Sequence, residues 1–163
     1  MHKRIIGGVL GACLGASLAS AKERAIVRSG PADAAIAATV SLPADARLVY
    51  VSGTVPDPIV PQAPQGSVER FGDTEAQTRS VLAKIEALLK GQGLGMGDVV
   101  MMRVFLVAPP GQARMDFAGM MRGYRAFFGT MAQPNKTARS TMQVAGLVDP
   151  GWLVEIEVTA ARR

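Results

Sequence analysis

The chain has 163 residues, with 18 lysines and arginines against 13 acidic residues, a formal net charge of +5. This length suits one ordinary domain with a sizeable core. The excess of positive charge is too small to predict nucleic-acid binding, and neither a basic stripe nor an aromatic platform is present in the sequence.

The first 21 residues have the pattern of a secretory signal peptide. A basic start precedes an apolar run that is too short to span a bilayer, and residues 19–21, reading ASA, form a cleavage pattern. We therefore expect residues 22–163 to be a single exported domain, in a bacterial periplasm, with no membrane attachment after cleavage. A second processing route is lipidation at Cys13, because the residues before it resemble a bacterial lipoprotein signal.

Removal of this segment restricts the chemistry of the mature domain. The only histidine, His2, and the only cysteine, Cys13, both lie within it. Their loss excludes a cysteine nucleophile, a histidine general base, a Ser-His-Asp triad and a zinc site built on histidine or thiolate ligands. Catalysis by the mature domain must therefore use carboxylates, arginine, lysine, tyrosine, hydroxyls or backbone groups.

The first elements predicted after the signal are strands. Residues 22–28 form a short mixed segment with the character of an edge strand. Residues 36–42 and 48–53 are predicted strands joined by a turn, so a hairpin is the simplest interpretation. Four prolines between residues 54 and 72 indicate a long extended loop, whose length suggests a role at a site or an interface.

A helix follows the loop, beginning at Asp73 or Thr74 and ending at Gly91. Apolar residues recur along it at spacings of three and four. Gln77, three residues after Thr74, completes a capping-box pattern in which each side chain bonds a backbone group of the other. We therefore expect an amphipathic helix with a defined start.

The next two elements are a strand and a second helix. Residues 99–107, reading VVMMRVFLV, are nearly all apolar, which suits a central strand covered on both faces. Arg103 is the one charge in this strand, and we expect it to extend toward the sheet edge. Residues 115–128 predict a helix whose methionine and aromatic stripe is core packing.

The segment from Thr137 onward carries one arginine and two glutamates on predicted strands. Polar and apolar residues alternate around Arg139 and again around Glu155 and Glu157, with a turn at the Asp-Pro-Gly sequence between the strands. We expect these strands to be neighbours, so that Arg139 and a glutamate share one pocket. From the residues alone, a salt bridge at the strand edge between Arg139 and one of the two glutamates is the slightly favoured explanation.

These elements predict an α+β fold with a single mixed β-sheet and two helices packed on one face. Crossovers from strand to helix to strand favour parallel pairing, whereas hairpins are antiparallel. The second face of the sheet is partly apolar and needs a cover. We therefore expect the chain to form an oligomer that packs these sheets together.

Several stretches resemble the reactive intermediate deaminase family, known as RidA or YjgF. They are YVSGTVPD at residues 50–57, the helix and strand over 75–106, YRAFFG at 124–129, and the ARS and EIE elements at 138–140 and 155–157. The resemblance covers nearly the whole mature chain. It implies a chorismate-mutase-like trimer.

The resemblance also implies a function. Members with deaminase activity hydrolyse reactive enamine or imine intermediates, the 2-imino acids, to 2-keto acids and ammonia, with no metal or organic cofactor. By position, Arg139 would bind the substrate carboxylate and Glu155 would position the attacking water. Backbone groups near Ser52 and Gly53 would join Arg139 in holding a small imino or keto acid in a cleft between subunits.

Three departures from the family pattern change the expected pocket. A tyrosine that lines the cleft in other members should fall near residues 37–39 and is absent. Met121 stands where an asparagine is expected, and Thr141 stands where a cysteine is common. The loss of the tyrosine and the asparagine favours an alternative, a non-catalytic small-carboxylate-binding or holdase-like module that uses the same cleft.

Overall fold

The computed structural model describes residues 25–162, so the predicted signal peptide, its cleavage site and Cys13 lie outside the described residues. The elements of this part of the chain follow in the order β1 (Val27–Ser29), β2 (Thr39–Ser41), β3 (Arg47–Thr54), α2 (Val68–Phe71), α3 (Thr74–Gly91), η1 (Met96–Asp98), β4 (Val99–Leu106), α4 (Phe117–Tyr124), β5 (Ala138–Gln143) and β6 (Val154–Arg162). No helix within residues 25–162 is long and apolar enough to cross a membrane.

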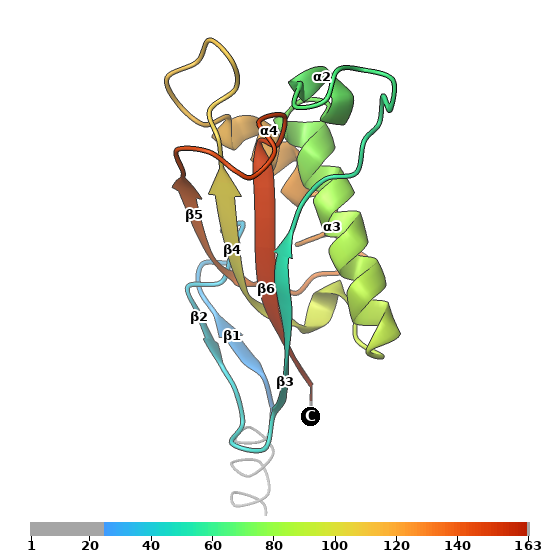
Figure 1. Cartoon of the computed structure of the whole chain (residues 1–163). Helices are drawn as coiled ribbons and strands as arrows, with labels where there is room; N and C mark the ends of the chain where they lie inside the picture. Colours follow the sequence, from blue (N-terminus) through green and yellow to red (C-terminus); the bar gives the residue numbers. More distant parts are fainter. Residues whose placement is uncertain (1–24, 163) are drawn as a thin grey trace, which may run out of the picture.

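The main sheet has four strands in the order β3-β6-β4-β5 (Figure 1). β6 pairs antiparallel with both β3 and β4, and β4 pairs parallel with β5 across the α4 crossover. The predicted α+β fold with a mixed sheet is therefore confirmed, and the apolar strand β4 is central as expected. The described residues also contain a separate two-stranded sheet, β1-β2, which the prediction of a single sheet omitted.

Two predicted strand pairings are wrong. β5 and β6 are not neighbours, because β4 lies between them. The ten residues between these two strands are more than a tight hairpin needs, so the chain can pass over β4. β2 pairs with β1 instead of β3, with Val27 opposite Ser41. Alternation with a period of two identifies the faces of a strand but does not identify its partner.

Both long helices lie on one face of the main sheet, as predicted. α3 buries Val81, Leu82 and Ile85 completely against it. α4 packs on α3 at Gly123, where an added Cβ would lie only 2.7 Å from the Thr78 Cβ atom. A residue larger than glycine would therefore push the two helices apart. This close contact fixes α4 above the strand β5, which carries Arg139.

The predicted capping role of Gln77 is wrong, because Asp73 alone caps α3. The Asp73 carboxylate accepts a hydrogen bond from the Ala76 amide at 2.8 Å. The fully buried Gln77 side chain instead donates to the Gly151 carbonyl at 2.9 Å and accepts from the Leu153 amide at 2.7 Å. Gln77 therefore holds the chain just before β6 begins, two residues from Glu155.

Candidate functional site

Arg139 lies on β5 with its side chain under α4. Its Nη2 atom is 3.1 Å from the Met121 sulfur, and its Nη1 atom is 3.9 Å from the Met120 sulfur. The guanidinium carbon is 4.4 Å from the ring centre of Tyr124 and 5.9 Å from that of Phe117. The charge is therefore held by thioethers and the faces of aromatic rings, which are weak cation partners.

No carboxylate within residues 25–162 forms an ion pair with Arg139. The predicted salt bridge with Glu155 or Glu157 is therefore absent from the chain. Burial lowers the pKa of Arg139 from its ordinary value, and the nearby Tyr124 hydroxyl acts weakly in the opposite direction. A partly buried cation without a counter-ion is an unsatisfied group that an anionic ligand would stabilise.

Two buried polar atoms at this site, one of them in the cation itself, also lack a protein partner. They are the Nε atom of Arg139 and the Oγ1 atom of Thr141. Their residues are two apart on β5, so both side chains point to the helix-covered face of the sheet. The guanidinium thus has an unpaired N–H of its own and a neighbouring unpaired hydroxyl, and both can bond a carboxylate oxygen.

Tyr124 closes the inner side of the Arg139 environment. Its ring stacks on Phe128, with centroids 4.8 Å apart, and its hydroxyl donates to the Ala35 carbonyl at 3.2 Å. Burial raises the pKa of Tyr124 to about 12, although the nearby Arg139 charge acts in the opposite direction. Tyr124 is therefore a neutral ring at physiological pH and not a general base.

Glu155 lies on β6, on the opposite face of the sheet, against Gly53. A β-bulge in β3 leaves Ser52 and Gly53 between the pairs Val51–Val158 and Thr54–Ile156. A Cβ atom added at Gly53 would overlap the Glu155 carboxylate. The glycine therefore makes the space in which this carboxylate lies, so the structure brings Glu155, Ser52 and Gly53 together as one cluster.

Arg139 is not part of that cluster. Arg139 is opposite Met102 on β4, whereas Glu155 is opposite Phe105, three residues further along the same strand. Two strand spacings and three residue steps separate their backbones by roughly 14 Å. The side chains also point to opposite faces, so the prediction that they share one pocket within a chain is wrong.

Glu157 and Arg103 form an ion pair of their own on the exposed face. The Arg103 Nη1 atom is 2.6 Å from the Glu157 carboxylate, across adjacent positions of β4 and β6. Both side chains remain partly exposed. Glu157 therefore has a partner within its own chain, and the pair has the character of a surface salt bridge.

The residues that depart from the family pattern lie close to Arg139. The amide of Ala37, from the segment expected to carry a tyrosine, donates to the Thr137 carbonyl at 3.0 Å, directly before β5. Met121 touches the guanidinium itself. Sequence reasoning assigned the methionines and aromatic residues of α4 to core packing and missed their contact with Arg139. Their helical spacing placed them on one face, but nothing in the sequence showed that this face covers an arginine.

The described residues do not form a metal-binding site. Within residues 25–162, no group of three histidine, cysteine, aspartate or glutamate side chains is placed to hold a metal ion. The candidate site therefore consists of two separate parts. One part is the uncompensated cation of Arg139 under α4, and the other is the Glu155 carboxylate beside the Ser52–Gly53 bulge.

Comparison with known proteins identifies the family to which the chain belongs. The family model described as Endoribonuclease L-PSP matches residues 32–162. The chain belongs to this family, the RidA/YjgF group that the sequence resembles. The resemblance and the chorismate-mutase-like fold are therefore confirmed.

The relatives share most of their length with this chain. It is 33% identical over 139 residues to a RutC family protein from Haemophilus influenzae, covering 85% of this chain and 97% of the relative. It is 34% identical to the 3-aminoacrylate deaminase RutC of Acinetobacter baylyi, covering 69% and 78%. The structure of Escherichia coli TdcF with bound serine matches with a TM-score of 0.56 and 30% identity, covering 86% of this chain and 95% of that one.

Proposed function

We propose that the protein hydrolyses 2-imino acids, formed from reactive enamine or imine intermediates, to 2-keto acids and ammonia. The observation that carries the proposal is the guanidinium of Arg139, which is partly buried and has no carboxylate partner within residues 25–162. A guanidinium offers a planar fork of donors that matches a carboxylate. A ligand carboxylate would supply the missing counter-ion.

The second part of the proposal is that two copies of the chain complete each site. Arg139 lies on β5, at one edge of the main sheet, and the Glu155 cluster lies near β3, at the other edge. A head-to-tail contact between copies would bring the β5 side of one against the β3 side of the next, and such contacts can close into a ring. We propose the homotrimer that the family resemblance implies.

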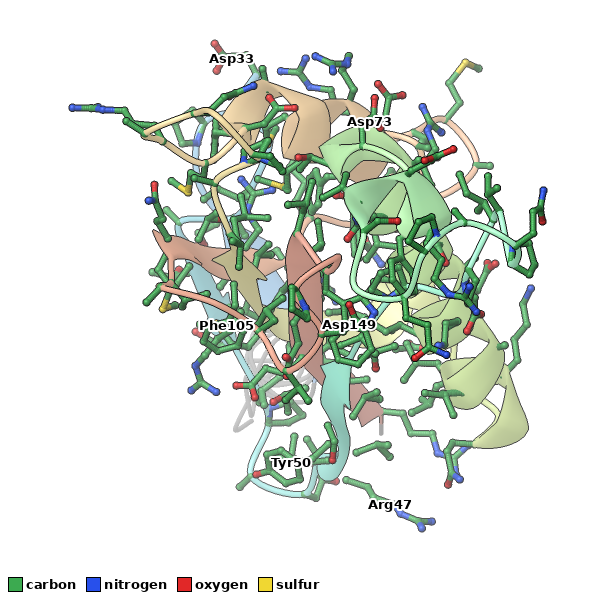
Figure 2. All side chains as sticks on the ribbon, turned by 45° about the horizontal axis from the view of Figure 1, so that its top comes forward. Asp33, Arg47, Tyr50, Asp73, Phe105 and Asp149 are labelled. Carbon is green, nitrogen blue, oxygen red and sulfur yellow. The ribbon has the colours of Figure 1, made fainter. Side chains whose placement is uncertain are left out.

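The exposed face of the sheet supports an assembly of this kind. Tyr50 on β3 is 73% exposed, and Phe105 on β4 lies on the same uncovered face (Figure 2). Large apolar side chains left in water favour burial against another surface. A neighbouring copy would cover them while delivering its Arg139 to the Glu155 cluster.

The reaction requires water to replace ammonia at the imine carbon. In the proposed site Glu155 accepts a proton from water as the water oxygen attacks the carbon of the protonated imine. The proton then passes to nitrogen, the C–N bond breaks, and the C=O bond of the keto acid forms. One iminium ion and one water thus give one keto acid and one ammonium ion, so no cofactor is needed to balance the reaction.

The relatives support the reaction class. The Acinetobacter relative is a 3-aminoacrylate deaminase, and the TdcF structure holds serine, a small molecule that carries a carboxylate. The name of the family model refers to ribonuclease activity. The only histidine of this chain is His2, outside the described residues, so the site has no imidazole base for RNA cleavage.

The test is an assay on purified protein with imines made in place by an amino-acid oxidase. Semicarbazide reacts with the imine that remains. A decrease in the trapped product, relative to a reaction without the protein, measures hydrolysis above the spontaneous rate. We expect acceleration that disappears in Arg139→Ala. Absence of acceleration with alanine-, leucine- and phenylalanine-derived imines alike would overturn the proposed activity. An amino-acid oxidase or dehydrogenase in the compartment to which the protein is exported would supply such imines in the cell.

One observation favours the second candidate, a binding module without chemistry. The Met121 sulfur lies 3.1 Å from Arg139, at the position where the family pattern has a polar asparagine. A thioether orients neither water nor an imine nitrogen. A binding module would lose keto-acid binding in Arg139→Ala and keep it in Glu155→Gln, with no turnover in the unmodified protein.

A further inference from the structure

We propose that the Arg139 site selects carboxylates with a large apolar substituent, branched or aromatic, and that Met121 and Phe117 are the residues that determine this specificity. The inference rests on the proposed function, because it takes the ligand to be a 2-imino acid held by Arg139. It goes further by naming the substrate class. It concerns the part of the ligand that the Arg139–Glu155 chemistry leaves free, namely the side chain on the imine carbon.

The position of the carboxylate limits where that side chain can lie. A carboxylate bound to the guanidinium has its oxygens about 2.7–2.9 Å from the nitrogens. The imine carbon is one bond beyond the carboxylate, and its substituent one bond beyond that. The first atoms of the substituent therefore lie within van der Waals reach of groups that themselves touch the guanidinium.

Four side chains on α4 surround that guanidinium, and all four are apolar or aromatic. Met120 and Tyr124 are almost completely buried behind it. Phe117 is 45% exposed and Met121 is 8% exposed, so solvent reaches these two of the four, Phe117 far more than Met121. A ligand arriving from solvent would therefore meet the Phe117 ring and the Met121 thioether.

These two groups suit an apolar substituent. A thioether is flexible and polarisable, and it packs well against aromatic rings. The Phe117 ring adds a face or an edge for the same purpose. A hydroxyl or charged substituent would lose its water without gaining a partner there. The nearest unpaired hydroxyl, Thr141 Oγ1, lies on the strand beside Arg139 and is buried.

A small substituent would also fit poorly. The methyl group of an alanine-derived imine covers little of the 45% of Phe117 that is exposed. Each additional methylene in an apolar pocket improves discrimination by about 10-fold to 200-fold. We therefore expect kcat/KM for leucine- and phenylalanine-derived imines to exceed that for alanine- and serine-derived imines by at least about tenfold.

The experiment compares these four imines in the trapping assay, with the unmodified protein, Met121→Asn and Met121→Leu. The imine carbon is no longer chiral, so D- or L-amino-acid oxidases give the same imine and the supply rate can be matched. Met121→Asn should reduce the preference about tenfold, mainly through KM, and Met121→Leu should retain it. Met131→Asn is the matched control, because Met131 is fully exposed.

A binding arm separates the failure of the inference from the failure of the proposed function. Calorimetric titration with 4-methyl-2-oxopentanoate, phenylpyruvate and pyruvate needs no turnover. Tighter binding of the first two ligands, lost in Arg139→Ala and weakened in Met121→Asn, is expected. Equal or tighter binding of pyruvate, or a preference unchanged in a folded Met121→Asn protein, would overturn the inference even if imines are hydrolysed. Selective binding without turnover would overturn only the proposed catalysis.

Discussion

Arg103 and Arg139 lie on neighbouring strands of one sheet, yet their surroundings are opposite. Arg103 points to the uncovered face, is about half exposed, and forms an ion pair with Glu157 at 2.6 Å. Arg139 points under α4, where sulfur atoms and aromatic rings take the place of a carboxylate. Arg103 therefore has a counter-ion within the chain, whereas Arg139 would need one from a ligand.

The same contrast separates the two glutamates of β6. Glu157 has its cation within the chain, whereas Glu155 lies against the Gly53 backbone and forms no ion pair within residues 25–162. Each functional candidate is thus the member of its pair that lacks a local partner. The family resemblance pointed to the same two residues, Arg139 and Glu155, by position alone.

The largest expected effect comes from removing the unpaired arginine. Arg139→Ala should lower kcat/KM for imine hydrolysis by about 1000-fold, because a charge-assisted carboxylate contact in a partly buried site is lost. Arg103→Ala should change it less than about threefold, because exposed ion pairs contribute little. Steady-state kinetics on both variants measures the difference. Equal losses would show that the contrast between the two arginines has no functional meaning.

The next effect concerns the two glutamates. Glu155→Gln should lower kcat by about 100-fold, the low end for a lost general acid or base, while calorimetric binding of a 2-keto acid persists. Glu157→Gln is the matched control and should retain most of kcat. Retention of kcat in Glu155→Gln would remove this residue from the proposed chemistry and favour the binding module.

A smaller effect is expected from the glycine beside Glu155. Gly53→Ala would displace the Glu155 carboxylate and should lower kcat about tenfold, since misplacement of a catalytic group by about 1 Å can cost up to 100-fold. Gly146→Ala is the control, because no atom lies within 4 Å of its added Cβ. Similar activity in both alanine variants would show that the close contact at Gly53 does not position Glu155.

The smallest effect is a spectroscopic one at the Arg139 enclosure. Absorbance titration of tyrosinate should show a transition at a pKa of about 12 that is missing in Tyr124→Phe. Because the pKa is raised in the folded state, the contribution of the protonated Tyr124 hydroxyl to the free energy of unfolding is fully present below pH 10. It is lost as the pH rises toward 12. Thermal unfolding should therefore show Tyr124→Phe losing less stability than the unmodified protein between pH 10 and pH 12. A Tyr124 transition at the ordinary value of 10.0 would show that the enclosure is open to water.

Much of the fold could be predicted because local signals agree with it. The apolar run of β4 identified a central strand, and the spacing of Val81, Leu82 and Ile85 identified the buried face of α3. Strand partners could not be predicted in this way. Nothing in the alternation around Arg139 or Glu155 states that β4 lies between them, because pairing depends on the path of the whole chain.

The candidate site shows the same division. Residue types and family position made Arg139, Glu155, Ser52 and Gly53 the candidates. That Arg139 lies alone while the other three residues form a cluster could not be predicted, because it depends on the order of the strands in the sheet. The role of Gln77 was missed because its pattern also fits a capping box, and only the tertiary contact with Leu153 distinguishes the two.

Arg139 and the Glu155 cluster lie on opposite faces of the sheet, and this has a genetic consequence. In the proposed ring, each site takes Arg139 from one copy and Glu155 from the next, so two inactive variants can complement each other. A mixture of Arg139→Ala and Glu155→Gln chains, assembled at random, would contain intact sites at about one quarter of its interfaces. Two alleles that are each null could therefore sustain activity together in one cell.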